Sequence, residues 1–390
     1  MSVTITTTQL LALRLRSHNL VAHGPRLSID DVATGMLAVQ AQDYVQGGWA
    51  LGIRARGSTL RDLNRALECG EIIRASPLRG TLHFLAARDL RWLLARTSPR
   101  EIAAAAPRLR QFDLDDRALR HARSVTESLL GDRAALSRAE YVRGLEAAGI
   151  ATGGQRGYHL IWWLAQSGIV CWGPARGTRQ GLVLAEEWIG ESVELVGDDA
   201  LRELARRYFA GHGPATDRDL AWWAKLPLSA ARAAIRLAGT DLIELQHLGK
   251  SHWATTETMD RTADNVVRPP RMSNTMHALP GYDEYLLGYQ DRSAAMPAEV
   301  GDRVITGRNG IFHPTMLARG RVVGTWQRSD SAGHATATIE PFSELETLDS
   351  LAFARSVGAF ERFRNVSQVP ERLPGIRSPS PRPRSPRPCR

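Results

Sequence analysis

Two glutamines separated by a single residue, Gln40 and Gln42, are placed so that they could act together on one small molecule. Each amide carries an acceptor oxygen and a donor nitrogen, so two amides that point the same way can hold a water molecule between them. Residues two apart face different directions in a helix but the same side in an extended chain. The water-holding interpretation therefore requires an extended segment. The alternative is that both amides bond only to nearby backbone.

The preceding segment predicts a helix that delivers the chain to this motif. Ser28, with an acidic residue three positions later, forms an approximate capping box and predicts the helix start. Val32, Met36 and Val39 then share one helix face. We expect the chain to leave the helix near Gln40, which would place the motif in extended backbone.

Other chemistries lack their sequence signatures. The chain has no phosphate-binding GxxxxGK[ST] loop, no GxGxxG turn, no HExxH helix and no GxSxG elbow. This disfavours an ATPase, a dehydrogenase, a zinc peptidase or a serine hydrolase. The three cysteines, Cys69, Cys171 and Cys389, are far apart and have no metal-ligand spacing. We expect a reduced, intracellular protein with no metal and no cofactor.

A recurring order of helix, turn, helix and two short strands predicts three tandem winged-helix repeats. The clearest repeat combines helices at Arg138–Ala148 and Tyr158–Ser167 with strands at Ile169–Trp172 and Leu182–Leu184. A second repeat contains helices and strands at Ala215–Lys225, Ser229–Gly239, Asp241–Leu248 and His252–Thr255. A third, less regular repeat contains a helix at Leu60–Cys69, a loop at Arg74–Arg79 and a strand at Gly80–Leu85.

The expected fold class is α+β, with the three repeats followed by a C-terminal β-rich element. The region after Leu279 is rich in glycine, aromatic and β-branched residues and predicts a hairpin, with Ala318–Gly320 at its turn. An arginine- and proline-rich end cannot form a core and is predicted to be disordered. The expected units are 1–125 with the glutamine motif, 126–195, 196–260, the β-rich element 261–365 and the tail 366–390.

The net charge of +9 is divided unevenly along the chain. The last fifteen residues contain five arginines and no acid, which leaves a net charge of +4 for the folded part. A basic protein suggests a nucleic-acid partner, with a solvated basic surface as the alternative. Net charge by itself is therefore a weak argument for DNA binding.

Four segments in the same order give the sequence a resemblance to a known family. They are Gln40–Gln42, Ser76–His83, Leu279–Tyr285, and Gly310–Pro314 followed by Gly320–Trp326. Together they resemble the winged-helix DNA glycosylases of the AlkZ/YcaQ type over roughly residues 8–365. The resemblance implies a C-shaped molecule around a DNA-sized channel. It also implies hydrolytic removal of alkylated purines, including unhooking of interstrand crosslinks. The arginine- and proline-rich tail departs from the family pattern.

The resemblance assigns the catalytic role to Gln40 and Gln42. The Gln-x-Gln form goes, in that family, with bulky or crosslinked N7-alkylguanine lesions, and some members protect producers of DNA-alkylating metabolites. Further residues are candidates for contacts with the lesion or with DNA because of their position in the predicted repeats or hairpin. They are Arg79, His83, Arg156, Arg176, Arg179, Arg308, Asn309 and His313.

Each of these candidates has a structural alternative. Arg79 and His83 could be a basic pair at a strand edge, and the winged helices could serve as scaffolds. Asp43 is expected to close a helix-to-loop junction, with a base beside the site as the alternative. Asp283 and Glu284 are expected to cap or pair structurally, and the Trp162–Trp163 and Trp222–Trp223 pairs to pack in cores or between repeats.

The expected protein is a monofunctional DNA glycosylase, because a Schiff-base mechanism needs an amine and only Lys225 and Lys250 are lysines. We expect a cytoplasmic monomer, associated with the nucleoid when acting, that binds double-stranded DNA and no membrane. The alternatives are a non-catalytic winged-helix DNA-binding protein or transcriptional regulator, and an RNA- or protein-binding scaffold.

Overall fold

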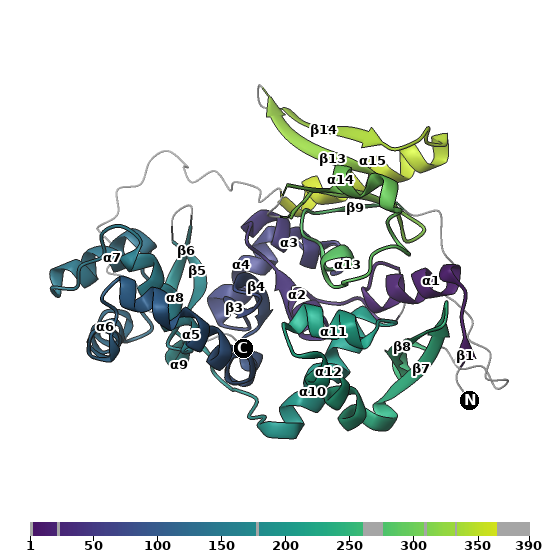
Figure 1. Ribbon diagram of the computed structural model, residues 1–390. Coiled ribbons are helices and arrows are strands. Elements are labelled where there is room, and N and C mark those ends of the chain that lie inside the picture. Colours follow the sequence, from purple (N-terminus) through teal and green to yellow (C-terminus); the bar gives the residue numbers. More distant parts are fainter. Residues whose placement is uncertain are drawn as a thin grey trace.

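The computed structural model describes residues 3–21, 24–176, 179–259, 276–307, 310–331 and 334–364. The helices α5–α8 of the central part (residues 90–166) and the β5–β6 hairpin (residues 170–184) form one side of the molecule (Figure 1). The C-terminal strands β13 and β14 (residues 321–341) and helix α15 (residues 347–364) lie over α3 (residues 44–52). The strands β7 and β8 (residues 242–255) form a sheet with the N-terminal strand β1 (residues 3–4), which pairs with β7. The expected α+β fold class is confirmed, whereas the division into units stays a prediction.

The N-terminal part leads into the glutamine motif through a short helix. Its elements are β1 (Val3–Thr4), α1 (Thr7–Ser17), α2 (Ile29–Met36), β2 (Val39–Gln40) and α3 (Tyr44–Gly52). The predicted capping box is confirmed, because Ser28 caps α2 and Asp31 returns the hydrogen bond. The helix ends at Met36, earlier than the spacing of Val39 predicts. Leu37 has a φ of 63° and the Ala38 amide donates to the Met36 carbonyl, which is a γ-turn of the rare positive-φ kind.

Each predicted repeat ends in an antiparallel hairpin. From here on the repeats are numbered in chain order, so that residues 60–86 form the first, residues 138–184 the second and residues 215–255 the third. The hairpins are β3 with β4, β5 with β6, and β7 with β8. That these units are winged helices stays a prediction. The elements are α4 (Leu60–Cys69), β3 (Ile72–Leu78), β4 (Thr81–Ala86), α5 (Leu90–Gln111), α6 (Asp116–Leu130), α7 (Arg138–Ala147), α8 (Arg156–Gln166), β5 (Val170–Arg176), β6 (Arg179–Leu184), α9 (Ala185–Trp188), α10 (Gly197–His212), α11 (Asp217–Ala224), α12 (Leu228–Ala238), β7 (Leu242–His247) and β8 (Lys250–Thr255).

The expectation of a loop at Arg74–Arg79 is wrong. Most of that segment is strand β3, and the turn consists of Arg79 and Gly80 alone. Ser76 and Pro77 are atypical of a strand interior, and they led to the prediction of a loop. The strand accommodates the proline because its register shifts between Ala75 and Leu78.

The C-terminal element combines a four-stranded sheet with a long helix that the sequence did not indicate. The predicted hairpin is confirmed, with Ala318 paired with Arg321 across the turn. Helix α15 covers this sheet and packs Phe360 and Phe363 against Trp49 of α3. The elements are β9 (Met276–Leu279), α13 (Glu284–Leu287), α14 (Gly301–Val304), β10 (Ile305–Thr306), β11 (Ile311–Phe312), β12 (Thr315–Ala318), β13 (Arg321–Ser331), β14 (His334–Pro341) and α15 (Thr347–Arg364).

A five-stranded sheet joins the glutamine motif to two of the repeats. Its strand order is β2-β4-β3-β5-β6, so the strand that contains Gln40 lies at one edge. Gln40 pairs with His83 of β4, and Arg74 of β3 pairs with Trp172 of β5. The hairpins of the first and second repeats therefore belong to one sheet, which fixes both relative to the motif.

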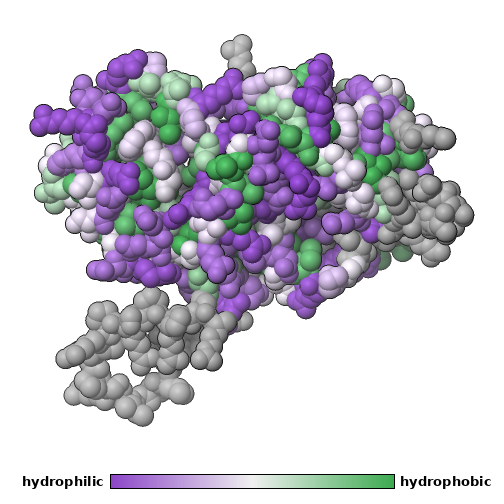
Figure 2. Space-filling view, turned by 90° about the horizontal axis from the view of Figure 1, so that it is seen from below, coloured by the Kyte–Doolittle hydropathy of each residue, from purple (hydrophilic) through white to green (hydrophobic). Residues whose placement is uncertain are grey.

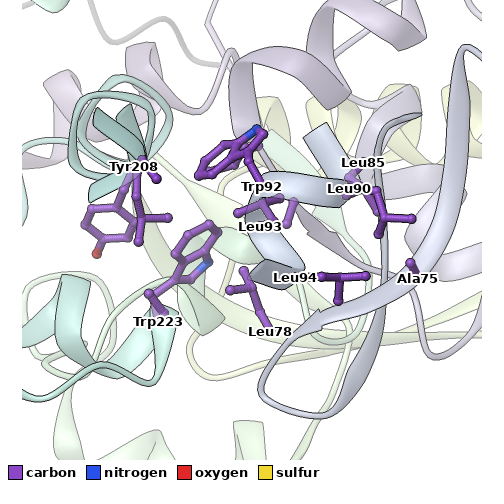
Figure 3. Packing of buried hydrophobic residues seen from close by; sticks show 14 of the residues in the cluster. Ala75, Leu78, Leu85, Leu90, Trp92, Leu93, Leu94, Tyr208 and Trp223 are labelled. Carbon is purple, nitrogen blue, oxygen red and sulfur yellow. The ribbon is translucent and has the colours of Figure 1, made fainter. Parts of the chain in front are cut away.

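One hydrophobic core spans the first and third repeats. Trp92 and Leu78, from α5 and β3, lie close to Trp223 and Tyr208 from α11 and α10 (Figure 3). Trp223 is fully buried, which confirms the packing role expected for it, whereas Trp222 is 42% exposed. This core holds α11 against the sheet that carries the motif.

The molecular surface does not show one dominant apolar face in the view of Figure 2. Hydrophilic residues cover most of this face, and hydrophobic residues appear as small separate patches. Within the described residues, no helix is both long enough and apolar enough to cross a membrane.

Candidate active site

The backbone of the glutamine motif is held by three different parts of the chain. The backbone amide of Gln40 donates to Oε1 of Glu284 at 3.1 Å, and the backbone amide of Ala41 donates to the Leu82 carbonyl at 2.7 Å. The Ala41 and Gln42 carbonyls accept from Arg74 at 2.8 and 2.9 Å. The extended backbone predicted for the motif is present at Gln40, and the chain then bends at Gln42.

The two amide side chains have different surroundings. Gln40 is only 6% exposed, and its side-chain amide makes no hydrogen bond with the described residues. Gln42 is exposed, and its Oε1 accepts from the Leu82 amide at 3.2 Å. Oε1 of Gln42 thus bonds to backbone, as the alternative predicts for both side chains, whereas its Nε2 remains available as a donor. Gln40 keeps both its acceptor and its donor for another molecule.

Glu284 is the buried carboxylate beneath the motif. Besides Gln40, it accepts from Nε1 of Trp223 at 2.9 Å, and it lies 3.5 Å from both Arg79 Nη2 and His212 Nε2. Burial alone would raise the pKa of Glu284, but the adjacent His212 imidazole and the charge of Arg79 outweigh it and lower the pKa to about 2. Glu284 is therefore an ionised structural anchor, as its predicted pairing role requires.

Arg79 reaches Glu284 from a strained turn. Leu78 pairs directly with Thr81, so Arg79 and Gly80 form a two-residue loop in which both have positive φ, as in a type I′ turn. Arginine rarely takes this conformation. It is retained here because the Arg79 guanidinium turns inward and donates to the Trp223 carbonyl at 2.9 Å.

His83 completes this buried cluster as a neutral imidazole. Its Nδ1 donates to the Thr81 carbonyl at 2.8 Å, which leaves Nε2 to accept from Arg79 Nη2 at 3.1 Å. Burial, together with the nearby charge of Arg79, lowers the pKa of His83 to about 3. His83 pairs with Gln40 and Arg79 reaches the carboxylate that accepts from the Gln40 backbone, but both side chains are bonded within the protein. Their contact with DNA or lesion stays a prediction.

A second buried ion pair fixes the segment before Glu284. Arg54 donates to both carboxylate oxygens of Asp283 at 2.7 and 2.8 Å. Asp283 also caps α13 by accepting from the Tyr285 amide at 2.8 Å. The expected structural roles of Asp283 and Glu284 are confirmed, and this pairing holds α13 in place under the motif.

Helix α3 begins immediately after the motif and packs closely against it. Asp43 caps this helix by accepting from the Gln46 amide at 2.9 Å. This role is structural, but Asp43 lies at the start of a helix and not at the expected helix-to-loop junction. A Cβ on Gly47 would lie 2.7 Å from the Cα of Ala41. Gly47 is therefore required by a close approach between α3 and the backbone of the motif.

Two of the other residues predicted to contact DNA, Arg156 and His313, form hydrogen bonds with residues outside the motif. Arg156 donates to the carbonyls of Ala151 and of Phe112, the latter at 2.9 Å, at the start of α8. His313 shares a 2.9 Å hydrogen bond with Thr306.

Arg176 is exposed at the end of β5. The side chain of Arg179 and the whole of Arg308 and Asn309 lie outside the described residues. The prediction that these residues contact DNA remains untested.

Three contributors were not found by sequence reasoning: Arg74, Trp223 as a donor to Glu284, and His212. Arg74 had a detectable signal, because an arginine inside an apolar strand requires buried acceptors. Trp223 and His212 lie some sixty to seventy residues before Glu284, and nothing local in the sequence pairs them. Within the described residues, no group of three or more His, Cys, Asp or Glu side chains is arranged to hold a metal.

The sequence matches the family model described as DNA glycosylase AlkZ-like over residues 33–363. An interstrand DNA cross-link repair glycosylase from Streptomyces sahachiroi is 25% identical over 366 residues, covering 89% of this chain and 93% of that protein. The solved structure of Streptomyces sahachiroi DNA glycosylase AlkZ shares this fold with a TM-score of 0.73 at 22% identity, covering 92% of this chain and 97% of that one. Because the family model spans most of the chain, including the glutamine motif and its buried supports, the protein belongs to the AlkZ-like DNA glycosylase family, whose members hydrolyse N-glycosyl bonds.

Proposed function

We propose that this glycosylase removes alkylated purines of the N7-alkylguanine type from double-stranded DNA and unhooks interstrand crosslinks. The crosslink part rests on the name of the Streptomyces sahachiroi relative. The observation that carries the proposal is the pair of uncharged amides at the motif. The Gln40 side chain makes no hydrogen bond with the described residues, and Oε1 of Gln42 accepts from the Leu82 amide.

Uncharged amides suit the chemistry of this substrate. Alkylation at N7 makes the purine cationic, so it leaves as a neutral base that takes the bonding electrons of the glycosidic bond. The enzyme then needs no strong acid for the leaving group. It needs a water molecule placed below C1′, and this water attacks the oxocarbenium-like sugar and releases its proton.

We assign the water to Gln40 and Gln42 acting together. The Oε1 of Gln40 would accept a hydrogen bond from the water, and Nε2 of Gln42, whose Oε1 is bonded to Leu82, would donate one to it. General-base assistance contributes about 10²–10⁴-fold, and an amide pair belongs at the low end because it orients water without taking a full proton.

The lysines support hydrolysis rather than a lyase reaction. Lys225, between α11 and α12, pairs with Glu101 at 2.8 Å, and Lys250 of β8 pairs with Asp291 at 3.1 Å. Neither contacts the motif, so neither offers an amine for a Schiff base there.

The direct test is release of 7-methylguanine from a methylated duplex in single turnover. We expect Gln40→Ala and Gln42→Ala each to slow release about 10–100-fold, with the double variant slowest. Gln111→Ala, an exposed glutamine at the end of α5, serves as the matched control and should keep the parent rate. Undiminished release by the double variant would remove the assignment. Duplex binding without any base release by the parent protein would instead favour a non-catalytic DNA-binding protein.

We also propose that the protein acts as a cytoplasmic monomer on nucleoid DNA and provides self-resistance to a DNA-alkylating metabolite. A crosslinked oligonucleotide tests the unhooking activity, since denaturing electrophoresis separates unhooked strands from the linked duplex. Survival of cells exposed to a crosslinking agent, with and without the gene, tests the resistance. Persistence of the linked duplex alongside release of 7-methylguanine would restrict the protein to simple adducts.

A further inference from the structure

Arg74 is the side chain through which β3 reaches the glutamine motif. Its Nε donates to the Ala41 carbonyl at 2.8 Å, and its Nη2 donates to the Gln42 carbonyl at 2.9 Å. Its Nη1 donates to Oε1 of Gln180 at 2.8 Å. Each of the three guanidinium nitrogens thus has an acceptor within the protein.

The two carbonyls bound by Arg74 are consecutive, which constrains the backbone between them. Successive carbonyls of a straight strand point to opposite sides, so one planar guanidinium reaches both only where the chain bends. The strand β2 ends at Gln40, and the bend follows at Gln42. The direction of the Gln42 side chain relative to Gln40 therefore depends on the bend that Arg74 holds.

Gln180 of β6 orients Arg74 from the second repeat. The Nε2 of Gln180 donates to the Gly173 carbonyl at 2.9 Å, which turns its Oε1 toward Arg74. The chain of contacts runs from the β5–β6 hairpin through Gln180 and Arg74 to the motif. These hydrogen bonds cross the five-stranded sheet from one edge toward the other.

We propose that Arg74 is a positioning residue for the hydrolytic water, acting through the backbone of Ala41 and Gln42, with Gln180 as its support. This inference rests on the proposed roles of Gln40 and Gln42. Arg74 does not touch the substrate, since its donors are directed at protein acceptors. Burial lowers the pKa of Arg74 to about 10, so the guanidinium is still charged at neutral pH.

The test separates the rate of base release from DNA affinity. We expect Arg74→Met to lower the single-turnover rate about 10–100-fold while the Kd for the duplex and its salt dependence stay within about threefold of the parent. Arg74→Lys should not restore the rate, because an ammonium cannot serve three acceptors in one plane. Gln180→Glu keeps the acceptor for Arg74 and should retain most of the rate, whereas Gln180→Leu should lose about three- to tenfold.

Arg206→Met is the matched control, because it removes a guanidinium paired with Glu203 on α10, away from the motif. A rate unaffected by Arg74→Met, or a loss that follows weaker binding and a shallower salt dependence, would overturn the proposal. The latter result would make Arg74 a phosphate contact.

Hydrogen exchange provides a readout that is independent of activity. Arg74→Met should speed exchange in the peptide covering residues 38–46, including the Ala41 amide bonded to Leu82, and leave peptides of α12 unchanged. Unchanged exchange at 38–46 would contradict the positioning role. If the parent protein releases no base, the proposed function fails, and this exchange measurement still decides whether Arg74 holds the motif.

Discussion

At the scale of single residues, the candidate site is an uncharged pair of amides placed above a strongly charged buried cluster. The Glu284 carboxylate accepts hydrogen bonds from the backbone amide of Gln40 and from Trp223, and it lies beside Arg79 and His212. Its negative charge is therefore compensated inside the protein. This separation suits a cationic substrate. The amides act on the water, because a cationic purine leaves as a neutral base and needs no strong acid.

Removing Glu284 should destabilise the fold more than removing an exposed carboxylate. We expect Glu284→Ala to lower the free energy of unfolding by about 3–5 kcal/mol, because Arg79 is left buried without its counter-charge. Glu284→Gln retains an acceptor and should lose less. Glu203→Ala, which breaks a partly exposed pair with Arg206 at the surface, should cost below about 1 kcal/mol. Urea denaturation followed by tryptophan fluorescence measures all three, and equal losses for Glu284→Ala and Glu203→Ala would contradict the anchoring role.

Buried neutral histidines should make the protein sensitive to acid. Burial lowers the pKa of His83 to about 3 and that of His277 to about 4, compared with about 6.5 in an unfolded chain. Between pH 6.5 and 4 the unfolded state binds protons that the native state does not. Stability therefore falls as the pH is lowered, by up to about 1.4 kcal/mol per pH unit for each histidine.

Urea midpoints at pH 7.5, 6 and 5 measure this dependence. The Nε2 of His277 is buried without a hydrogen-bond partner among the described residues, so leucine should be tolerated at this position. His277→Leu should reduce the slope by up to about 1.4 kcal/mol per pH unit. An identical slope in this variant would show that His277 does not contribute.

At the scale of elements, short segments with unusual backbone deliver the functional side chains. The γ-turn at Leu37 ends α2 and starts β2, and the type I′ turn directs Arg79 into the core. Helix α3 then closes against the motif at Gly47. Each device depends on tertiary contacts that compensate the local strain.

Gly47 gives a test of the close approach between α3 and the motif. Gly47→Ala should cost about 1–3 kcal/mol of stability and slow base release about tenfold or more, because the new Cβ would overlap Ala41. Gly35→Ala in α2 is the matched control, since its Cβ would meet nothing within 4 Å. It should be neutral or stabilise by about 0.5–1 kcal/mol. Normal release by Gly47→Ala would show that the motif tolerates displacement.

At the scale of the whole molecule, one sheet and one core tie the three parts of the chain to the motif. The five-stranded sheet brings in the hairpins of the first and second repeats, and the core around Trp223 brings in the third. The net charge is divided differently, because more than half of it lies in the last fifteen residues. The residues bonded to the motif lie in the folded part, and we predict that the tail adds only non-specific attraction to DNA.

Shortening the chain to end at Arg364 separates these contributions. Duplex affinity should fall steeply with salt in the full chain, and the truncated chain should bind more weakly at low salt. Its rate of base release per bound complex should be unchanged, because the described residues that bond to the motif, Arg74, Leu82 and Glu284, are all retained. Anisotropy titrations at several salt concentrations and single-turnover assays measure both quantities. A loss of rate at saturating enzyme would show that the tail takes part in catalysis.

The sequence by itself determined the features that depend on neighbours a few residues apart. These include the cap at Ser28, the extended chain at Gln40 and the hairpin turn at Gly320. Capping and turn formation involve groups within about four residues, so the local pattern contains the necessary information. The four motifs also indicated the family.

Only the tertiary structure decided which side chains satisfy the backbone of the motif. Glu284 lies 244 positions from Gln40, and Arg74 and Gln180 come from two other strands. A buried amide or carbonyl must find a partner, but any correctly placed donor or acceptor meets that need. The inward direction of Arg79 was decided in the same way. Its charge is stabilised by Glu284 inside the fold, and nothing near it in the sequence specifies that pairing.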